Sequence, residues 1–133
     1  MNAAVLATPS QAADRARIGA EGAHSTILSV SDLLGQAMSI MQLLDQTRGD
    51  DAISGVLRLV GQDHGEADEM EGGSEQLSRL DFSDLSVSVS VTQSMLRLVN
   101  TPERDCSTLS GVDTILQVVI DRLEEQQSSM EGV

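Results

Sequence analysis

Aliphatic side chains spaced three and four residues apart are the feature that most constrains how this chain can fold. That spacing keeps side chains on one face of an α-helix. It predicts a first helix over residues 26–47 and a second that begins at Asp50 or Asp51 and ends at Gly72-Gly73, with fraying beyond Gln62 where like-charged carboxylates crowd. The first apolar stripe is Ile27, Val30, Leu34, Ala37, Met41 and Leu44, and the second includes Ile53, Val56, Val60, Ala67 and Met70.

One stretch has the pattern of a strand and not of a helix: LSVSVSVT, residues 85–92, alternates apolar and hydroxyl residues as a half-buried strand does. A helix over the same residues would gather Val87, Val91, Met95 and Leu98 on one face. No other segment shows this alternation, so a strand here would have no partner. We therefore predict a third helix over residues 83–100.

An apparent internal repeat supports the helical interpretation. LSVS occurs at residues 28–31 and again at 85–88, and SGV occurs at 54–56 and again at 110–112. If the halves are related, residues 85–92 correspond to the start of the first helix. A fourth helix with Val112, Leu116, Val119 and Leu123 on its apolar face follows.

Polar residues and glycines at suitable positions are expected to mark the helix ends. Serine with an acid three residues later is typical of a capping box, and glycine is typical of a C-terminal stop. The predicted signals are Ser29 with Asp32, Gly49, Ser83 or Asp84, and Ser110 with Asp113.

The predicted fold class is therefore all-α. Two tandem helical hairpins, 26–71 and 83–129, form a four-helix bundle over residues 25–133, preceded by a flexible N-terminal arm over residues 1–24 that is rich in Ala and Gly. The third and fourth helices carry β-branched residues on more than one face, which indicates burial on two sides and favours a dimer.

Charge and composition exclude several classes of partner. The net charge is −13 and all eight basic residues are Arg, so direct binding to nucleic acid or to an anionic membrane is disfavoured and a protein partner with a basic surface is expected. Phe82 is the only aromatic residue, which leaves few rings for stacking on nucleotides. Neither a signal peptide nor a membrane span is predicted, and the single Cys106 indicates a reducing, cytoplasmic location.

No catalytic, metal or cofactor site is predicted. His64, Glu66, Asp68 and Glu71 are the densest set of potential metal ligands, but they match no zinc or EF-hand pattern and are interpreted as a solvated acidic face. Cys106 lacks the surroundings of a nucleophile, and phosphate-loop and serine-elbow motifs are absent. The chain is therefore expected not to be an enzyme.

Two sets of residues are the predicted binding surfaces. The expected function is a non-enzymatic, acidic helical protein that binds and regulates a macromolecular partner through its helical faces. One alternative is an acidic mimic of nucleic acid that inhibits a DNA- or RNA-handling machine, as phage anti-defence proteins do; another is a component, chaperone or substrate of a secretion system. The predicted partner-binding residues are Asp63, Glu66, Asp68, Glu69, Glu71 and Glu75, and the predicted dimer or partner packing residues are Val87, Val91, Met95, Leu98, Val119 and Leu123.

Overall fold

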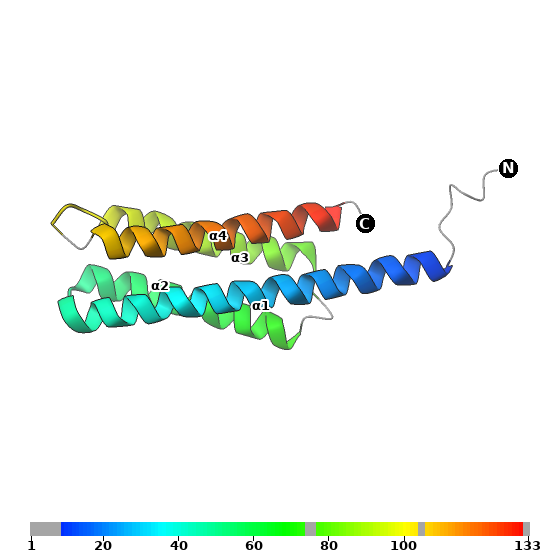
Figure 1. Cartoon of the computed structure of the whole chain (residues 1–133), viewed down its shortest axis with the longest axis horizontal. Helices are drawn as coiled ribbons and strands as arrows, with labels where there is room; N and C mark the ends of the chain where they lie inside the picture. Colours follow the sequence, from blue (N-terminus) through cyan, green and yellow to red (C-terminus); the bar gives the residue numbers. More distant parts are fainter. Residues whose placement is uncertain (1–8, 74–76, 104–105, 132–133) are drawn as a thin grey trace.

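Four helices and no strand make up the part of the chain that the computed structural model describes, residues 9–73, 77–103 and 106–131. They are α1 (Pro9–Arg48), α2 (Asp51–Gly72), α3 (Arg79–Val99) and α4 (Cys106–Glu131). Each helix packs on the next, and α4 returns to pack on α1 (Figure 1). The predicted all-α, four-helix architecture is confirmed.

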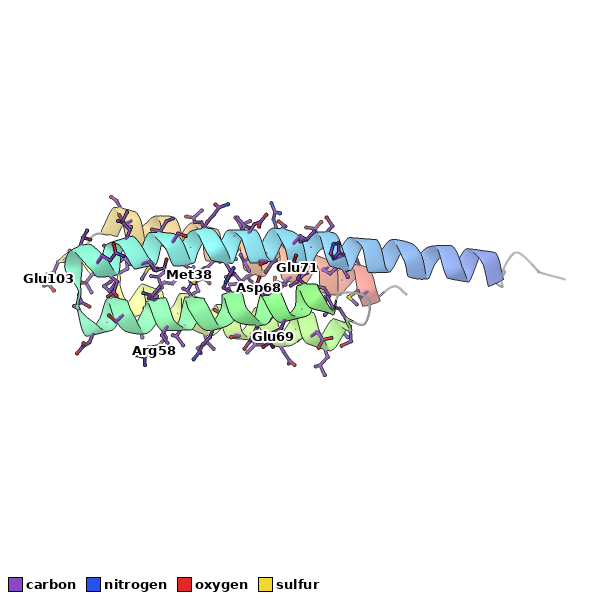
Figure 2. All side chains as sticks on the ribbon, turned by 90° about the horizontal axis from the view of Figure 1, so that it is seen from below. Met38, Arg58, Asp68, Glu69, Glu71 and Glu103 are labelled. Atoms are coloured by element: carbon purple, nitrogen blue, oxygen red, sulfur yellow. The ribbon has the colours of Figure 1, made fainter. Side chains whose placement is uncertain are left out.

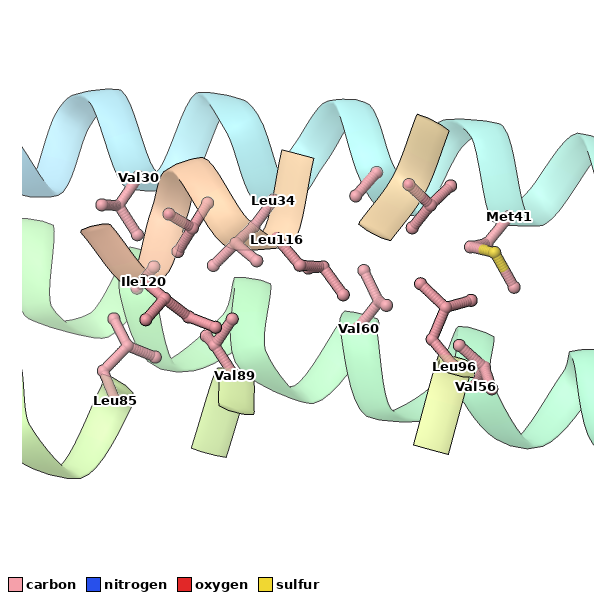
Figure 3. Packing of buried hydrophobic residues seen from close by; sticks show 14 of the residues in the cluster. Val30, Leu34, Met41, Val56, Val60, Leu85, Val89, Leu96, Leu116 and Ile120 are labelled. Carbon is pink, nitrogen blue, oxygen red and sulfur yellow. The ribbon is translucent and has the colours of Figure 1, made fainter. Parts of the chain in front are cut away.

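Aliphatic side chains from all four helices fill the centre of the bundle (Figure 3). The stripe predicted for the first helix is buried along its whole length, from Ile27 to Leu44. Phe82, the single aromatic residue, is also fully buried. Because full burial of one such side chain contributes about 1.5–3 kcal/mol, this continuous core is the main source of stability.

The stretch at residues 85–92 is helical, as predicted, and lies within α3. Of the four apolar residues in this stretch, the helix places Leu85 and Val89 in the core, whereas Val87 and Val91 point outward. The helix also brings Ser88 and Thr92 to one side of α3, where their hydroxyls donate hydrogen bonds to Asp63 of α2. Packing against the rest of the bundle therefore overrides the local β-propensity of the valines.

The predicted connection between the first two helices is confirmed. Gly49 adopts a positive φ of 53°, and its N–H donates to the Asp45 carbonyl at 2.8 Å, which ends α1. The Asp50 carboxylate then accepts from the Ile53 N–H at 2.9 Å and caps α2. α2 ends at Gly72 as predicted, and it remains helical past Gln62.

Three predicted capping positions are wrong because the helices begin earlier. The cap of α3 is Ser78, not Ser83 or Asp84: the Asp81 N–H donates to Ser78 Oγ and the Ser78 N–H to Asp81 Oδ2. α4 begins at Cys106, so the Ser110 and Asp113 pair lies inside the helix. The Ser29 and Asp32 pair likewise lies inside α1.

The N-terminal region differs from the predicted separate arm over residues 1–24. α1 is described as helix from Pro9, and Ala23 is already buried. Residues 1–8 lie outside the described residues, and the flexibility of the arm stays a prediction. In Figure 1, the N-terminal part of α1 extends beyond the other helices.

The apparent sequence repeat gains no support from the burial pattern. Val30 and Val87 occupy the same place in the two LSVS segments, yet Val30 is fully buried and Val87 is 62% exposed. At the first position of the two segments the burial is reversed, because Leu28 is exposed and Leu85 is buried. Related halves would keep equivalent residues on equivalent faces.

One segment of α1, Gly22–Thr47, is long and apolar enough to cross a membrane by length and composition alone. The sequence predicted no such span, because no segment approaches about 20 uninterrupted apolar residues. The core helix of a soluble protein passes the same test. Here the apolar face of the segment, from Ile27 to Leu44, packs against the other helices.

Candidate functional site

The predicted acidic surface divides into separate parts, because its residues point to different sides of α2. Asp63 is 1% exposed and points toward α3, where its two carboxylate oxygens accept hydrogen bonds of 2.5 Å from Ser88 Oγ and Thr92 Oγ1. Burial raises the pKa of the Asp63 carboxyl, and the two hydroxyl donors oppose that shift. Asp63 therefore joins two helices and is not available to a partner.

Asp68 and Glu71 lie on the other side of α2, facing α1 (Figure 2). The Asp68 carboxylate accepts from Ser31 Oγ at 2.6 Å and lies 3.8 Å from His64 Nδ1. Glu71 is half-buried. Glu75 lies outside the described residues, so the structure does not place it.

Glu66 and Glu69 line a solvent-facing depression between α2 and α3, which we call the acidic hollow. Asp81 and Asp84 of α3 complete its set of four carboxylates, and its apolar lining is Met70, Leu77 and Leu85. Its volume is about 350 Å³. Asp84 falls within the helix that the sequence predicts, whereas Asp81 lies in α3 because the helix begins earlier than predicted.

The negative charge of the acidic hollow affects the pKa of Glu66. The pKa of its carboxyl is raised, first by partial burial and then by the negative charges of Asp63, Glu69 and Asp84. These neighbouring charges make the Glu66 carboxyl harder to ionise. The hollow is therefore a place where an added positive charge is favourable.

A second surface runs along the outside of α3, which we call the outer stripe: Leu80, Val87, Val91, Met95 and Leu98. These side chains are 43–73% exposed. Four of them were predicted as packing residues. Leu80 was missed because the third helix was predicted to begin at residue 83, although Leu80 stands seven positions before Val87, two helical turns away on the same face.

Val119 and Leu123, the other predicted packing residues, are not on a surface. Both have no exposed area and belong to the central core. They pack within this chain, so the prediction that they contact a second chain is wrong. The β-branched residues on more than one face of α4 are explained by its two neighbours in the bundle, because α4 packs on both α1 and α3.

Potential ligands and nucleophiles do not assemble into a reaction centre in the described ranges. No three His, Cys, Asp or Glu side chains there come close enough to hold a metal ion. Residues that line a polar depression between α1 and α4 bond to one another, because Arg122 donates to Ser29 Oγ and Thr26 Oγ1 donates to Gln126 Oε1 at 3.0 Å. The Cys106 side chain lies outside the described residues.

Comparison with known proteins gives no family for this chain. No protein-family model matches it, and searches of curated proteins and of solved structures found no match. The acidic hollow is therefore the feature from which a function is proposed.

Proposed function

We propose that this protein is a non-enzymatic helical protein that binds and regulates a macromolecular partner, and that the acidic hollow receives a basic segment of a protein. One observation carries the proposal: four carboxylates from two helices line the same depression as apolar side chains. A Lys or Arg side chain has a matching construction, with an apolar stem and a positive head. The stem would cover Met70 and Leu85 while the head meets Glu66 and Asp84.

The negative charge of α2 supports a basic partner. This helix carries six acidic residues and one basic residue, Arg58. Such a field accelerates the approach of a positively charged surface, and each exposed ion pair alone adds little affinity. A partner therefore needs several basic residues, or apolar contacts beside them.

The test compares two variants with the same change in charge. The hollow variant carries Glu66→Gln, Glu69→Gln and Asp84→Asn; the matched control carries Asp121→Asn, Glu124→Gln and Glu125→Gln on the exposed side of α4. Each is used as bait in lysate of the native host, and bound proteins are identified by mass spectrometry. We expect a basic protein to be retained by wild type and control and lost from the hollow variant. Identical captures with all three baits would contradict the proposal.

A second candidate, the nucleic-acid mimic, is favoured by the same four carboxylates. It requires that the captured partner be a nucleic-acid-binding protein and that DNA or RNA compete with the chain for it. The spread of the predicted acids over opposite sides of α2 weakens this candidate, since a mimic needs a row of charges. A complex unaffected by competing duplex or single strands would exclude it.

A further inference from the structure

The outer stripe of α3 is an apolar surface that the proposed function does not use. Of the seven large hydrophobic residues exposed in the described part of the chain, five lie on this helix. They are on the side of α3 opposite the buried Leu85, Val89 and Leu96. Contiguous apolar residues on a surface are typical of an interface.

Charge distinguishes α3 from the helix beside it. Arg79 and Arg97 balance Asp81 and Asp84, so α3 has no net charge in a chain whose net charge is −13. Arg97 is turned toward α4, where its Nε lies 3.0 Å from Asp113. A basic partner has little to bind along the stripe. Because α3 has no net charge, two copies of this acidic chain can approach each other along α3 with little repulsion.

Four of the five residues of the outer stripe also have the symmetry that an antiparallel pair of identical helices requires, and the fifth, Met95, corresponds to Ser83. Leu80 and Leu98 lie nine positions before and after Val89, and Val87 and Val91 lie two positions before and after it. We propose that the outer stripe binds the outer stripe of a second copy, antiparallel, about a two-fold axis beside Val89. Leu80 then meets the second copy's Leu98, and Val87 meets its Val91.

The antiparallel orientation keeps the acidic hollows apart. Asp84 and Asp81 lie five and eight positions from Val89, so each is about 15 and 24 Å along the axis from its equivalent in the second copy. Both separations exceed the Debye length of about 8 Å at physiological ionic strength. A parallel pair would bring the two hollows side by side.

The small area of the outer stripe limits the affinity of the dimer. Leu80 to Leu98 spans about 27 Å of a helix about 10 Å wide, a projected area of about 270 Å². A standard stable interface takes about 800 Å² of accessible surface from each partner. We therefore expect a dimer that dissociates on dilution through the micromolar range. This inference does not depend on the basic partner proposed above.

The test measures mass against concentration by sedimentation. The weight-average mass is expected to rise from 14.1 kDa toward twice that value, and to rise further at high salt, where repulsion is screened. Val91→Glu is expected to weaken association at least about tenfold, a loss of about 1.4 kcal/mol. Leu43→Glu, at a 64% exposed position of α1, is the matched control and should not weaken it. A mass of 14.1 kDa at every concentration overturns the proposal and leaves the stripe for another protein or a lipid surface.

Disulfide trapping tests the orientation in a Cys106→Ser background. Chains with Leu80→Cys mixed with chains carrying Leu98→Cys are expected to link to each other, because the antiparallel pair places these positions together. Leu98→Cys chains alone should remain unlinked, since their cysteines lie about 27 Å apart. Efficient linking of Leu98→Cys chains to one another would show a parallel pair and overturn the orientation.

Discussion

Asp63 of α2 accepts a hydrogen bond of 2.5 Å from Thr92 of α3, and both residues are 1% exposed. Ser88 supplies a second hydroxyl at the same distance. A carboxylate is thus held between two helices by two hydroxyl donors. Burying a charge is costly even with two donors, so this site makes stability depend on pH.

Asp63→Asn is predicted to be at least as stable as the wild type at neutral pH. The pKa of Asp63 is raised above its usual value of 3.8, so protonation favours the folded state. In the wild type, the free energy of unfolding therefore gains a contribution as pH falls from the raised pKa to 3.8, and the variant lacks it. Urea unfolding followed by circular dichroism, at several pH values, measures the difference. A variant that loses stability at neutral pH, but not near pH 3.8 where the wild-type carboxyl is protonated, would show that the charge itself is needed.

Thr92→Val keeps the shape of the side chain and removes one donor to Asp63. We expect a loss of about 1–3 kcal/mol at neutral pH, because the carboxylate keeps its burial with one hydrogen bond fewer. The loss should shrink in the Asp63→Asn background, where no charge remains to be satisfied. Thr114→Val is the control, since Thr114 is exposed and bonds only within its own helix, to the Ser110 carbonyl. Equal losses in both backgrounds would argue against coupling.

The core of the bundle was predictable from spacing, whereas the contacts between helices were not. Ile27 to Leu44 repeat at helical intervals, and the structure buries them. Nothing local marks Asp63 as buried among the acids of α2, because its partners lie 25 and 29 residues away. Likewise, the acidic hollow needs Asp81 and Asp84 from α3, and local spacing does not show which helices become neighbours.

Helix starts were the least predictable feature, because several serine and acid pairs fit the same pattern. Ser78→Ala is predicted to cost about 1 kcal/mol, since it removes the side-chain acceptor for the Asp81 N–H. Ser83→Ala, at the position where the sequence suggested a cap, should have a smaller effect because Ser83 lies inside α3. Thermal unfolding of the two variants compares them. A larger loss for Ser83→Ala would mean that α3 begins later.

Two glycine substitutions are predicted to act in opposite directions. Gly49 has a φ of +53°, which strains any side chain, so Gly49→Ala should cost about 1–2 kcal/mol. Gly55 lies inside α2 with no neighbouring atom within 4 Å of an added Cβ, so Gly55→Ala should stabilise by about 0.5–1 kcal/mol. Chemical unfolding of both variants gives the sign directly. A stabilising Gly49→Ala would rule out the left-handed turn between α1 and α2.

Relief of repulsion in the acidic hollow is predicted to stabilise the bundle. Glu66 lies near Asp63, Glu69 and Asp84, whose negative charges contribute to its raised pKa, so Glu66→Gln removes several unfavourable pairs at once. Because Glu66 is exposed, we expect a gain of only a few tenths of a kcal/mol at low ionic strength, disappearing in high salt. Glu103→Gln, an equal change in the connection between α3 and α4, is the control and should have little effect. The measurement is the unfolding temperature of each variant across a salt series. A gain for Glu66→Gln that persists in high salt would have to come from packing and not from charge.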